Sequence, residues 1–259
     1  MQRARSVKSF AVSTPVSFRE HLFDRYKLLY DWLPADAAPV LDVGCGNGIY
    51  TQHLARKCGA AVGVDHNQKN LAWAKKEFPF CEFVFSNGEN LPFDDESFGA
   101  VMLTEVLEHT RDDRQTLREI ARVTKPGGTL LLSTPHRGLF AGLDPDNTLN
   151  LLFTRLSKMR IPKPGGGRFY ENFSFDWHRH YGEEELRDLL GENWRVEEVA
   201  FGGLFLYPVL YGVENLIDSF GSTRSYWKDY RMLRRIRGLD FDLNFGKLSY
   251  NIAFRCTRI

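Results

Sequence analysis

The sequence predicts an α/β protein with a doubly wound, mostly parallel sheet of seven strands and with lid insertions. Short apolar segments alternate with helical patterns at βαβ spacing, and right-handed crossovers between them give a doubly wound sheet. A glycine-rich loop joins the first apolar segment to the helix after it. Polar residues directly follow several of the segments, so we expect them at the carboxyl edge of the sheet, where such folds bind ligands.

The predicted elements follow in chain order. Phe18, Leu22, Tyr26 and Leu29 recur at helical spacing, which predicts an amphipathic helix over residues 16–33. The strands are predicted at residues 40–43, 61–64, 82–85, 98–103, 129–133, 195–199 and 248–255, the last at or near the edge of the sheet. The helices between them are predicted at residues 49–57, 68–77, 112–123 and 183–190, with Thr110 as the N-cap of the third.

Two long insertions interrupt this alternation, at residues 136–181 and 201–246. Irregular segments of such length inside a compact domain are usually functional or disordered, and the many aromatic residues of the first favour order. We therefore expect residues 1–37 to form an N-terminal tail and helix, and residues 38–259 to form one domain whose insertions make a substrate lid.

Composition excludes several classes of protein. The formal net charge of +1 over 259 residues gives no global sign of a nucleic-acid partner. The four cysteines are scattered without a C-x-x-C pair, which favours free thiols in a reducing compartment and a cytoplasmic location. No apolar run is long enough to span a membrane. The first 19 residues are basic and lack acids, which fits either an organelle transit segment or, as we prefer, a loosely docked tail.

The loop from Gly44 to Gly48 is the strongest local signal of a ligand site. It follows the buried strand over residues 40–43 and precedes a helix whose N-terminus presents unpaired N–H groups. Asp65 ends the second strand, at the distance expected of an acid that accepts from ribose hydroxyls. A plain strand-to-helix turn without a ligand is the simpler alternative, and the position of Asp65 argues against it.

The glycine spacing separates two classes of nucleotide-binding protein. The dinucleotide fingerprint is G-x-G-x-x-G, whereas this loop is G-x-G-x-G and Asp42 lies in the strand before it. The stretch over residues 41–48 resembles the first motif of the class I S-adenosylmethionine (SAM) methyltransferases. Residues 90–98, 106–109 and 117–132 are similar to later segments of that family, in the same order. The resemblance covers about residues 38–136 and points to the small-molecule, ubiquinone-biosynthesis-like branch.

The resemblance implies SAM as cofactor and assigns roles to residues of this chain. The glycines would cradle the cofactor, Asp42 would orient the loop or meet the methionine amino group, and Asp65 would hold the ribose. Asn87, with Gly88, would line the adenine pocket, although relatives usually carry Asp at this position. The full set of expected cofactor-binding residues is Asp42, Gly44, Cys45, Gly46, Gly48, Asp65, His66, Asn87, Gly88, Glu89, Thr104 and Glu105.

Methyl transfer to a hydroxyl also needs a base, and histidine is the natural candidate. His136 directly follows the fifth strand, His180 precedes a core helix, and His109 lies beyond the fourth strand. His178, two residues before His180, is also plausible, and we expect at least one of the four to face the acceptor, with His136 or His180 first. No Asn-Pro-Pro-Tyr-like tetrapeptide follows the fourth strand, which favours an oxygen over a nitrogen acceptor. Glu105, Glu108 and His109 could instead hold a divalent metal, but we predict no metal ligands.

The second insertion carries an apolar start, residues 201–211, and a basic stretch between Ser222 and Gly238. This combination suits peripheral contact with a membrane or a lipid-like substrate, although a helix that simply solvates its arginines would look the same. Three rival functions stay open: a nicotinamide dehydrogenase, a non-catalytic protein that binds SAM or a partner through this fold, and a membrane-associated lipid or quinone methyltransferase. We expect a small-molecule or lipid-like substrate and no nucleic acid; membrane contact through residues 201–237 stays open as the alternative to a solvated helix, which we prefer.

Overall fold

The computed structural model describes residues 24–139, 141–144, 147, 178–204, 206, 208–210, 213 and 231–259, with only the backbone of residues 143, 231–234 and 237. The predicted start of the first helix, before residue 24, and most of the insertion at 136–181 lie outside these residues. By contacts the chain divides into two compact units. Unit 1 comprises Met1–Thr134, Gly182–Ala200 and Ala253–Ile259, and unit 2 comprises Pro135–Tyr181 and Phe201–Ile252. Whether the insertions form a substrate lid stays a prediction.

The sheet has seven strands in the order β3-β2-β1-β4-β5-β7-β6. The strands are β1 (Val40–Val43), β2 (Ala61–Asp65), β3 (Glu82–Phe85), β4 (Phe98–Thr104), β5 (Thr124–Pro135), β6 (Trp194–Gly202) and β7 (Asn251–Arg258). The predicted doubly wound sheet of seven strands is confirmed, and β1 pairs in parallel with both β2 and β4. The order reverses between β1 and β4, which is the switch point where open α/β sheets bind ligands.

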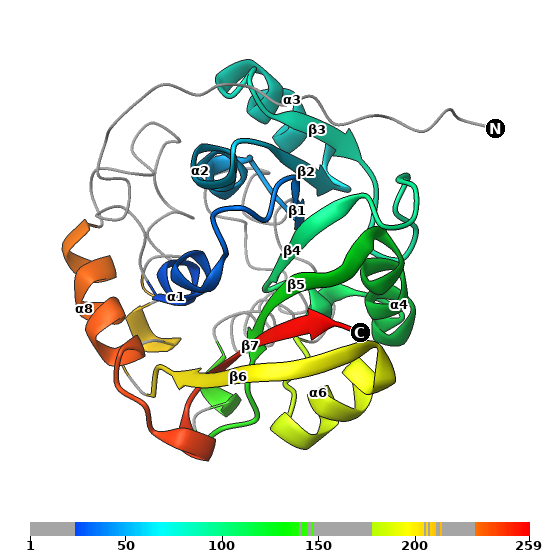
Figure 1. Cartoon of the computed structure of the whole chain (residues 1–259). Coiled ribbons are helices and arrows are strands. Elements are labelled where there is room, and N and C mark those ends of the chain that lie inside the picture. The colour runs from blue at the N-terminus through cyan, green and yellow to red at the C-terminus, as the bar shows by residue number, and fades with distance from the viewer. Residues whose placement is uncertain are drawn as a thin grey trace, which may run out of the picture. The chain divides into compact units, whose positions relative to one another are not determined.

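The helices are α1 (Asp24–Trp32), α2 (Ile49–Cys58), α3 (Gln68–Glu77), α4 (Asp113–Val123), α6 (Glu183–Leu190) and α8 (Arg231–Phe241). Short 3-10 helices are η2 (Leu107–His109), η3 (Ala141–Leu143), η4 (Gly191–Asn193) and η5 (Gly246–Leu248). Figure 1 shows α1 and α2 on one face of the sheet and α4 and α6 on the other. No helix within the described ranges is long and apolar enough to cross a membrane.

Local chemistry sets the ends of these helices. The Asn67 side chain accepts from the backbone N–H groups of Lys69 and Asn70, which caps the start of α3. Gly59 ends α2 in the left-handed conformation, and its N–H donates to the carbonyl of Ala55. The N-cap of α4 is Asp112, whose carboxylate accepts from the Gln115 N–H. The prediction of Thr110 was wrong, because its hydroxyl donates back to the Leu107 carbonyl instead.

The last strand begins later than predicted. Leu248 lies in η5, and β7 starts at Asn251, because the backbone between them is already engaged. The N–H of Tyr250 donates to Gly203 and its carbonyl accepts from the N–H of His136. The strand lies second from the edge, between β5 and β6.

Register aligns the ends of the central strands. Val43 of β1 lies opposite Val64 of β2 and Leu103 of β4. The residue that follows each of these three, namely Gly44, Asp65 or Thr104, therefore lies at the same edge of the sheet. All four residues of β1 are buried, as expected for a parallel strand covered on both faces. This edge belongs entirely to unit 1 and carries the candidate ligand site.

Candidate functional site

The glycine loop is held by backbone hydrogen bonds to its neighbouring strand. The N–H groups of Gly44 and Cys45 both donate to the Val64 carbonyl, at 2.8 and 2.9 Å. The N–H of Gly48 then donates to the Cys45 carbonyl at 2.9 Å, which closes the turn before α2. The end of β2 therefore fixes where the loop lies.

Two glycines of the loop serve different purposes. Gly48 has φ +76°, and a Cβ there would lie 2.6 Å from the Phe83 ring and 2.9 Å from the Ala74 Cβ. Gly46 has φ +53°, but a Cβ there would meet nothing within 4 Å. Gly48 is thus needed for close packing of the loop on β3 and α3. Gly46 instead borders open space, where its bare backbone lets a ligand approach closely.

Hydrogen bonds to the Asp65 carboxylate link the end of β2 to the glycine loop. One carboxylate oxygen accepts from the Gly46 N–H at 2.8 Å, and the other accepts from the Asn67 N–H at 2.7 Å. Each oxygen retains a second lone pair, so the same carboxylate can still accept from a ligand hydroxyl. His66 follows it, and its ring Nδ1 lies 3.9 Å from the Asp65 carboxylate on an exposed side chain.

Asp42 is buried one position before the end of β1. Its carboxylate accepts from the Thr51 hydroxyl at 2.5 Å, which ties β1 to the first turns of α2. Burial raises the pKa of Asp42 to about 7, against a lowering by the Thr51 hydrogen bond. The carboxyl group is therefore poised to titrate near neutral pH.

The end of β4 combines an unsatisfied hydroxyl with a strained backbone. The Thr104 Oγ is buried and has no hydrogen-bond partner among the residues the structure describes. Glu105 follows with φ +54°, a conformation that costs about 1–2 kcal/mol for an L-residue and that concentrates at functional sites. Its carboxylate accepts from the Ser133 hydroxyl at 3.0 Å and pairs with Arg25 at 3.3 Å.

Helix α1 borders the same edge of the sheet. Arg25, which reaches Glu105, is almost fully buried, and the neighbouring Tyr26 stacks on Tyr50 with ring centroids 3.6 Å apart. Tyr50 belongs to the first turn of α2, directly after the glycine loop. These contacts place α1 beside the loop and the end of β4.

The polar side chains of the turn after β3 accept hydrogen bonds from backbone groups of the chain itself. The Asn87 side-chain oxygen accepts from the Asn90 N–H at 3.1 Å. The Glu89 carboxylate accepts from the N–H groups of Arg111 and Asp112, at 2.7 and 3.3 Å, just before α4 begins. Gly88 is buried against Thr116. All three predicted residues lie at the carboxyl edge, but the two side chains already have partners that sequence analysis did not foresee.

Cys45, the cysteine of the glycine loop, has a weakly reactive thiol. Burial raises the pKa of the Cys45 thiol well above its usual range. The other three cysteines are also free, and burial raises the pKa of Cys58 to about 11 and that of Cys81 and Cys256 to about 12. Cys45 therefore contributes shape and backbone groups to the site and no nucleophile.

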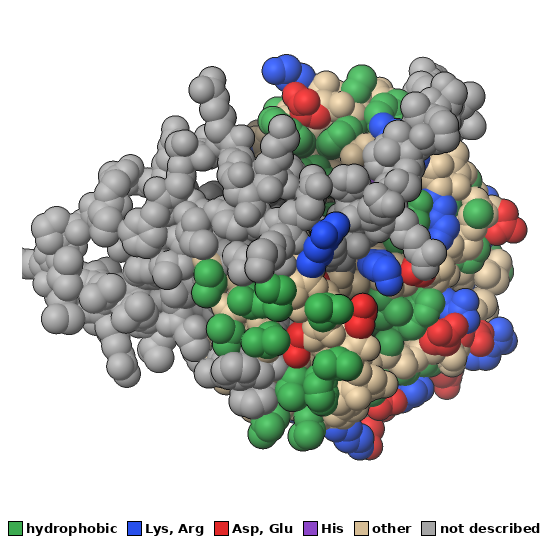
Figure 2. All heavy atoms as spheres, turned by 90° about the vertical axis from the view of Figure 1, so that its left-hand side faces the viewer, with side chains coloured by type: hydrophobic (Ala, Val, Ile, Leu, Met, Phe, Trp, Pro, Cys, Tyr) green, Lys and Arg blue, Asp and Glu red, His purple; other side chains and the backbone are tan. Residues whose placement is uncertain are grey.

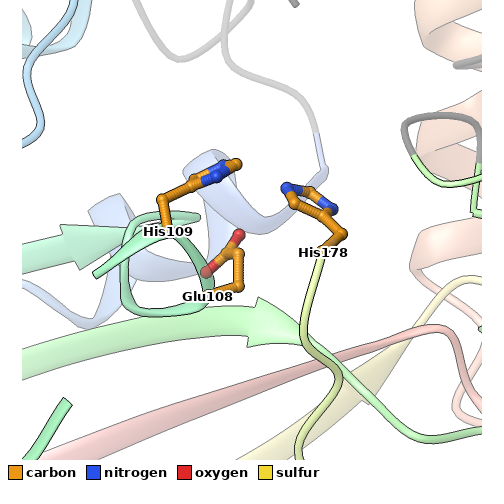
Figure 3. Close-up of side chains that lie close together, drawn as sticks. All are labelled: Glu108, His109 and His178. Atoms are coloured by element: carbon orange, nitrogen blue, oxygen red, sulfur yellow. The ribbon is translucent and has the colours of Figure 1, made fainter. Parts of the chain in front are cut away.

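Glu108 and His109 project from η2, beyond β4, as Figure 3 shows. The Glu108 carboxylate is buried and accepts from the Thr134 hydroxyl at 3.0 Å, whereas His109 is exposed. A carboxylate oxygen of Glu108 and a ring nitrogen of His109 come within 4.8 Å of each other.

Unit 2 holds a buried carboxylate between two histidines. Asp144 is fully buried, and His178 Nδ1 lies within hydrogen-bond distance of its Oδ2, at 3.0 Å. His180 Nε2 lies 3.1 Å from the same oxygen but outside hydrogen-bond geometry, so this is an ion pair when the imidazole is protonated. Asn147 bonds to both backbone groups of His178, its amide donating to the carbonyl and its oxygen accepting from the N–H.

His136 forms an isolated β-bridge with Tyr181, the residue after His180, within unit 2. Its Nδ1 is 2.9 Å from the Ser249 carbonyl, which can only accept, so Nδ1 carries the proton and Nε2 carries the lone pair in the neutral ring. The ring packs edge-on against Phe201 at 5.2 Å and is buried. The catalytic role of His136, His180 or His109 stays a prediction.

Comparison with known proteins agrees with this geometry. A family model described as a methyltransferase domain matches residues 41–132. A demethylmenaquinone methyltransferase of Tropheryma whipplei is 31% identical over 185 residues, covering 68% of this chain and 75% of that protein. A probable SAM-dependent methyltransferase of Mycolicibacterium smegmatis is 33% identical over 135 residues, covering 51% of this chain and 52% of that protein. The chain thus spans about half the length of this second relative.

Solved structures agree on the fold. A SAM-dependent methyltransferase from Methanosarcina mazei, 22% identical, superposes with a TM-score of 0.56 over 91% of this chain and 99% of that one. A geranyl diphosphate methyltransferase in complex with SAM, 14% identical, gives a TM-score of 0.55 over 91% of this chain and 84% of that one. The chain therefore belongs to the class I SAM-dependent methyltransferase family, and the predicted Rossmann-like methyltransferase fold is confirmed.

SAM is the cofactor that this membership implies, and the residues present fit it. The space beside Gly46 admits a ligand against bare backbone. The Asp65 carboxylate has acceptor capacity left for ribose hydroxyls, and the buried Thr104 hydroxyl lacks a partner among the described residues. An orphaned buried polar atom is costly unless a ligand or water satisfies it.

Sequence analysis missed two residues that the structure brings to the candidate sites. Asp144 lies in an irregular segment, and nothing in its sequence neighbourhood indicates that it meets His178 and His180. Arg25 could have been suspected, because an arginine on the buried side of an amphipathic helix needs an acid as partner.

Proposed function

We propose that this chain is an enzyme that transfers the methyl group of SAM to an oxygen atom of a small-molecule or lipid-like acceptor. The observation that carries the proposal is the aligned strand edge, where the open backbone at Gly46, the Asp65 carboxylate and the unpartnered Thr104 hydroxyl meet in unit 1. The family membership supports the same conclusion.

Each predicted residue has a role at this edge. The glycine loop and the N-terminus of α2 would receive the carboxylate end of the cofactor, because the N-cap residue Gly48 has no side chain and the Ile49 N–H makes only a long 3.4 Å bond to the Asn47 side chain. Asp65 would accept from the ribose hydroxyls while holding Gly46 in place. The adenine pocket would be formed by His66, Asn87, Gly88 and Glu89. Thr104 and Glu105 would contact the methionine part.

When bound, SAM supplies a methyl group on a positively charged sulfur, which leaves as a neutral thioether when the acceptor oxygen takes the methyl. The chain's own contribution is to position the acceptor in line and to exclude water. A histidine takes the proton that the hydroxyl loses. Among the candidates, His136 has Nδ1 bonded to the Ser249 carbonyl, which leaves Nε2 as the basic nitrogen.

The acceptor class is favoured by the relatives. One is described as a demethylmenaquinone methyltransferase, and another, from Mycobacterium tuberculosis, as a phthiotriol/phenolphthiotriol dimycocerosates methyltransferase, 41% identical over 93 residues covering 34% of each protein. Quinones and long-chain lipids are both membrane-soluble. We infer that residues 201–237 contact a membrane surface to reach such an acceptor, and that the enzyme works in the cytoplasm, where its free thiols stay reduced.

Calorimetric titration with SAM and with its demethylated product tests the cofactor assignment. We expect micromolar binding, weakened tenfold or more (about 1.4 kcal/mol) by Asp65→Ala. Asp94→Ala is the matched control, because this acid is exposed and lies outside the strand edge. No binding at millimolar ligand, or equal losses in both variants, would contradict the proposal.

A second experiment separates an enzyme from a non-catalytic SAM-binding protein. The chain is incubated with methyl-labelled SAM and with quinols, lipids and small phenols in turn. Transfer of label that is lost in His136→Asn, His180→Asn or His109→Asn, with SAM affinity unchanged, would identify the base. Cofactor binding without transfer to any acceptor would favour the non-catalytic alternative.

A further inference from the structure

Large hydrophobic side chains on the described surface concentrate in unit 2. Figure 2 shows such side chains gathered on the side of the molecule where α8 lies. Unit 1, although larger, exposes only Trp73, Phe85 and Ile259 among its described residues. Those of unit 2, which we call the apolar face, are Leu139, Leu206, Val209, Val213, Leu239, Leu243 and Leu248. Exposed apolar groups of this density mark an interaction site rather than random surface.

The apolar face is built on two helical segments. Residues 206, 209 and 213 are helical, and their spacing of three and four puts Leu206, Val209 and Val213 on one side. Leu239 of α8 and Leu243 just beyond it are likewise four residues apart, with exposed fractions of 67% and 56%.

One buried acid ties these segments together. The Asp240 carboxylate on α8 accepts from the Leu204 N–H at 2.9 Å and also from the backbone N–H of Leu206. The turn that starts the first segment is therefore fixed on α8. At the other end, the Leu139 N–H donates to the Leu248 carbonyl at 3.2 Å, so these two exposed leucines are neighbours as well. The apolar face is consequently a constructed surface and not a set of isolated side chains.

Positive charge follows the apolar start of the insertion at residues 201–246 in the sequence. The stretch between Ser222 and Gly238 carries six basic residues, namely Arg224, Lys228, Arg231, Arg234, Arg235 and Arg237, and Asp229 is its single acid. Four of them belong to α8, and Arg235, which is exposed, lies one helical turn before Leu239. A helix that offers leucines beside arginines is the pattern of an interfacial helix on anionic lipid.

We propose that the apolar face docks on an anionic membrane surface, with its leucines in the acyl boundary and the exposed Arg235 of α8 on lipid phosphates. This deepens the proposed function, because a lipid-like acceptor would be met where the enzyme docks. A second copy of the chain fits the face less well. A symmetric dimer buries the same patch on both partners, so it would bring two arginine-rich helices to one interface.

Sedimentation with vesicles tests the proposal on the full chain. Vesicles of phosphatidylcholine are compared with vesicles that also contain phosphatidylglycerol. We expect binding to the mixed vesicles that falls as salt rises, because surface charge is screened. The double variant Leu239→Asp/Leu243→Asp should reduce partitioning at least tenfold, an estimate from the apolar area that two leucines withdraw from water.

Controls are available in unit 1. Ile259→Asp changes a side chain that is 66% exposed, against 67% for Leu239, and should leave partitioning unchanged. Arg235→Glu should reduce binding to the mixed vesicles by at least about fivefold, whereas Lys76→Glu on α3 should not. SAM titration of each variant reports whether unit 1 is intact, so loss of vesicle binding is distinguished from failure of the methyltransferase assignment.

Several results would overturn the proposal. Equal losses in Leu239→Asp/Leu243→Asp and Ile259→Asp would show that the apolar face is not the contact. Displacement from vesicles by a soluble short-chain phosphatidylglycerol, below the concentration at which it forms micelles, would indicate a single-lipid pocket instead of a surface. A dimer that Leu239→Asp converts to a monomer, without vesicle binding in the wild type, would assign the face to a second copy.

Discussion

The glycine loop of unit 1 and the histidine cluster of unit 2 both surround a buried carboxylate, but they satisfy it differently. Asp65 accepts from two backbone N–H groups, those of Gly46 and Asn67, which are donors at every pH. Asp144 is met by the side chains of His178 and His180, whose donor capacity depends on protonation. The cofactor edge is therefore held by backbone donors, whereas the cluster in unit 2 is held by side chains that come from a distant part of the sequence.

The two carboxylates also differ in how far along the sequence their partners lie. The partners of Asp65 are fixed by the local path of the chain through the turn and the loop. The partner of Asp144 lies 34 residues away along the sequence. Substitutions that disturb the backbone should therefore damage unit 1 most, and substitutions that remove charge should damage unit 2 most.

The largest effect should come from breaking the backbone of the loop with Gly48→Ala. A Cβ there would press on the buried Phe83 ring and would also have to adopt φ +76°. We expect the free energy of unfolding to fall by about 4 kcal/mol, from overpacking and left-handed strain combined. Urea denaturation measures this change.

The matched control for that variant is Gly46→Ala, where a Cβ meets nothing within 4 Å. It should cost only about 1 kcal/mol of stability, from its positive φ, but should lower SAM affinity at least tenfold because the Cβ occupies the open space. Similar unfolding free energies for both variants would show that the two glycines do not have separate roles.

Asp144→Asn should have the next largest effect, confined to unit 2. Burial alone would raise the pKa of Asp144, but hydrogen bonding and the charges of His178 and His180 hold it well below its usual range. An acid with a depressed pKa stabilises the fold above about pH 4, and this contribution is lost as pH falls. We therefore expect about 3 kcal/mol of destabilisation at neutral pH, as for other broken buried ion pairs.

Hydrogen exchange of the backbone N–H groups of residues 178–181 measures this loss locally. Asp242→Asn is the control, because that acid is exposed on the same unit. If Asp144→Asn leaves exchange at these positions unchanged, the cluster does not hold the segment in place. If exchange rises equally in β1 and β2, the effect is global and the two units do not differ as we argue.

The last effect depends on pH and sharpens the comparison, because Asp42 is a titratable acid within unit 1. Burial raises its pKa to about 7, so the folded state binds a proton that the unfolded state has already released. Stability should therefore decrease as pH rises from about 4 to about 7, by up to about 1.4 kcal/mol per pH unit. Asp42→Asn should remove this part of the pH dependence while keeping an acceptor for Thr51.

Thermal or urea unfolding at several pH values, for wild type and Asp42→Asn in parallel, shows whether the free energy of unfolding falls as pH rises. A wild type whose stability rises with pH across this window relative to the variant would show that the Asp42 carboxyl is ionised in the folded protein. Asp94→Asn, at an exposed acid, should leave the pH profile unchanged.

Much of unit 1 could be predicted because its signals are local. The bounds of β1, β3, α3 and α6 agree with prediction, since each is an apolar or amphipathic run delimited by caps or glycines. The aligned edge followed from parallel pairing, which brings strand ends together whatever the loops contain. The glycine loop and Asp65 were placed at that edge by this argument, and Thr104 was expected there from the family resemblance.

Other features depend on contacts that a sequence does not display. The start of β7 was misplaced by three residues, because the backbone at Tyr250 is taken by His136 and Gly203 from distant segments. Asn87 was expected to offer its oxygen to a ligand, yet that oxygen accepts from Asn90 three residues on. The meeting of Asp144 with two histidines has no periodic or motif signature at all.

The rates at which the four free thiols react with alkylating reagents can report how different parts of the folded chain open. Alkylating reagents attack the thiolate, and the raised pKa values of Cys45, Cys58, Cys81 and Cys256 keep the thiolate fraction very small near neutral pH. Modification then proceeds mainly through molecules that have opened. Because Cys45 lies in the glycine loop and Cys256 in β7, the relative speeds at which the two are labelled would time the opening of the loop against the opening of the sheet.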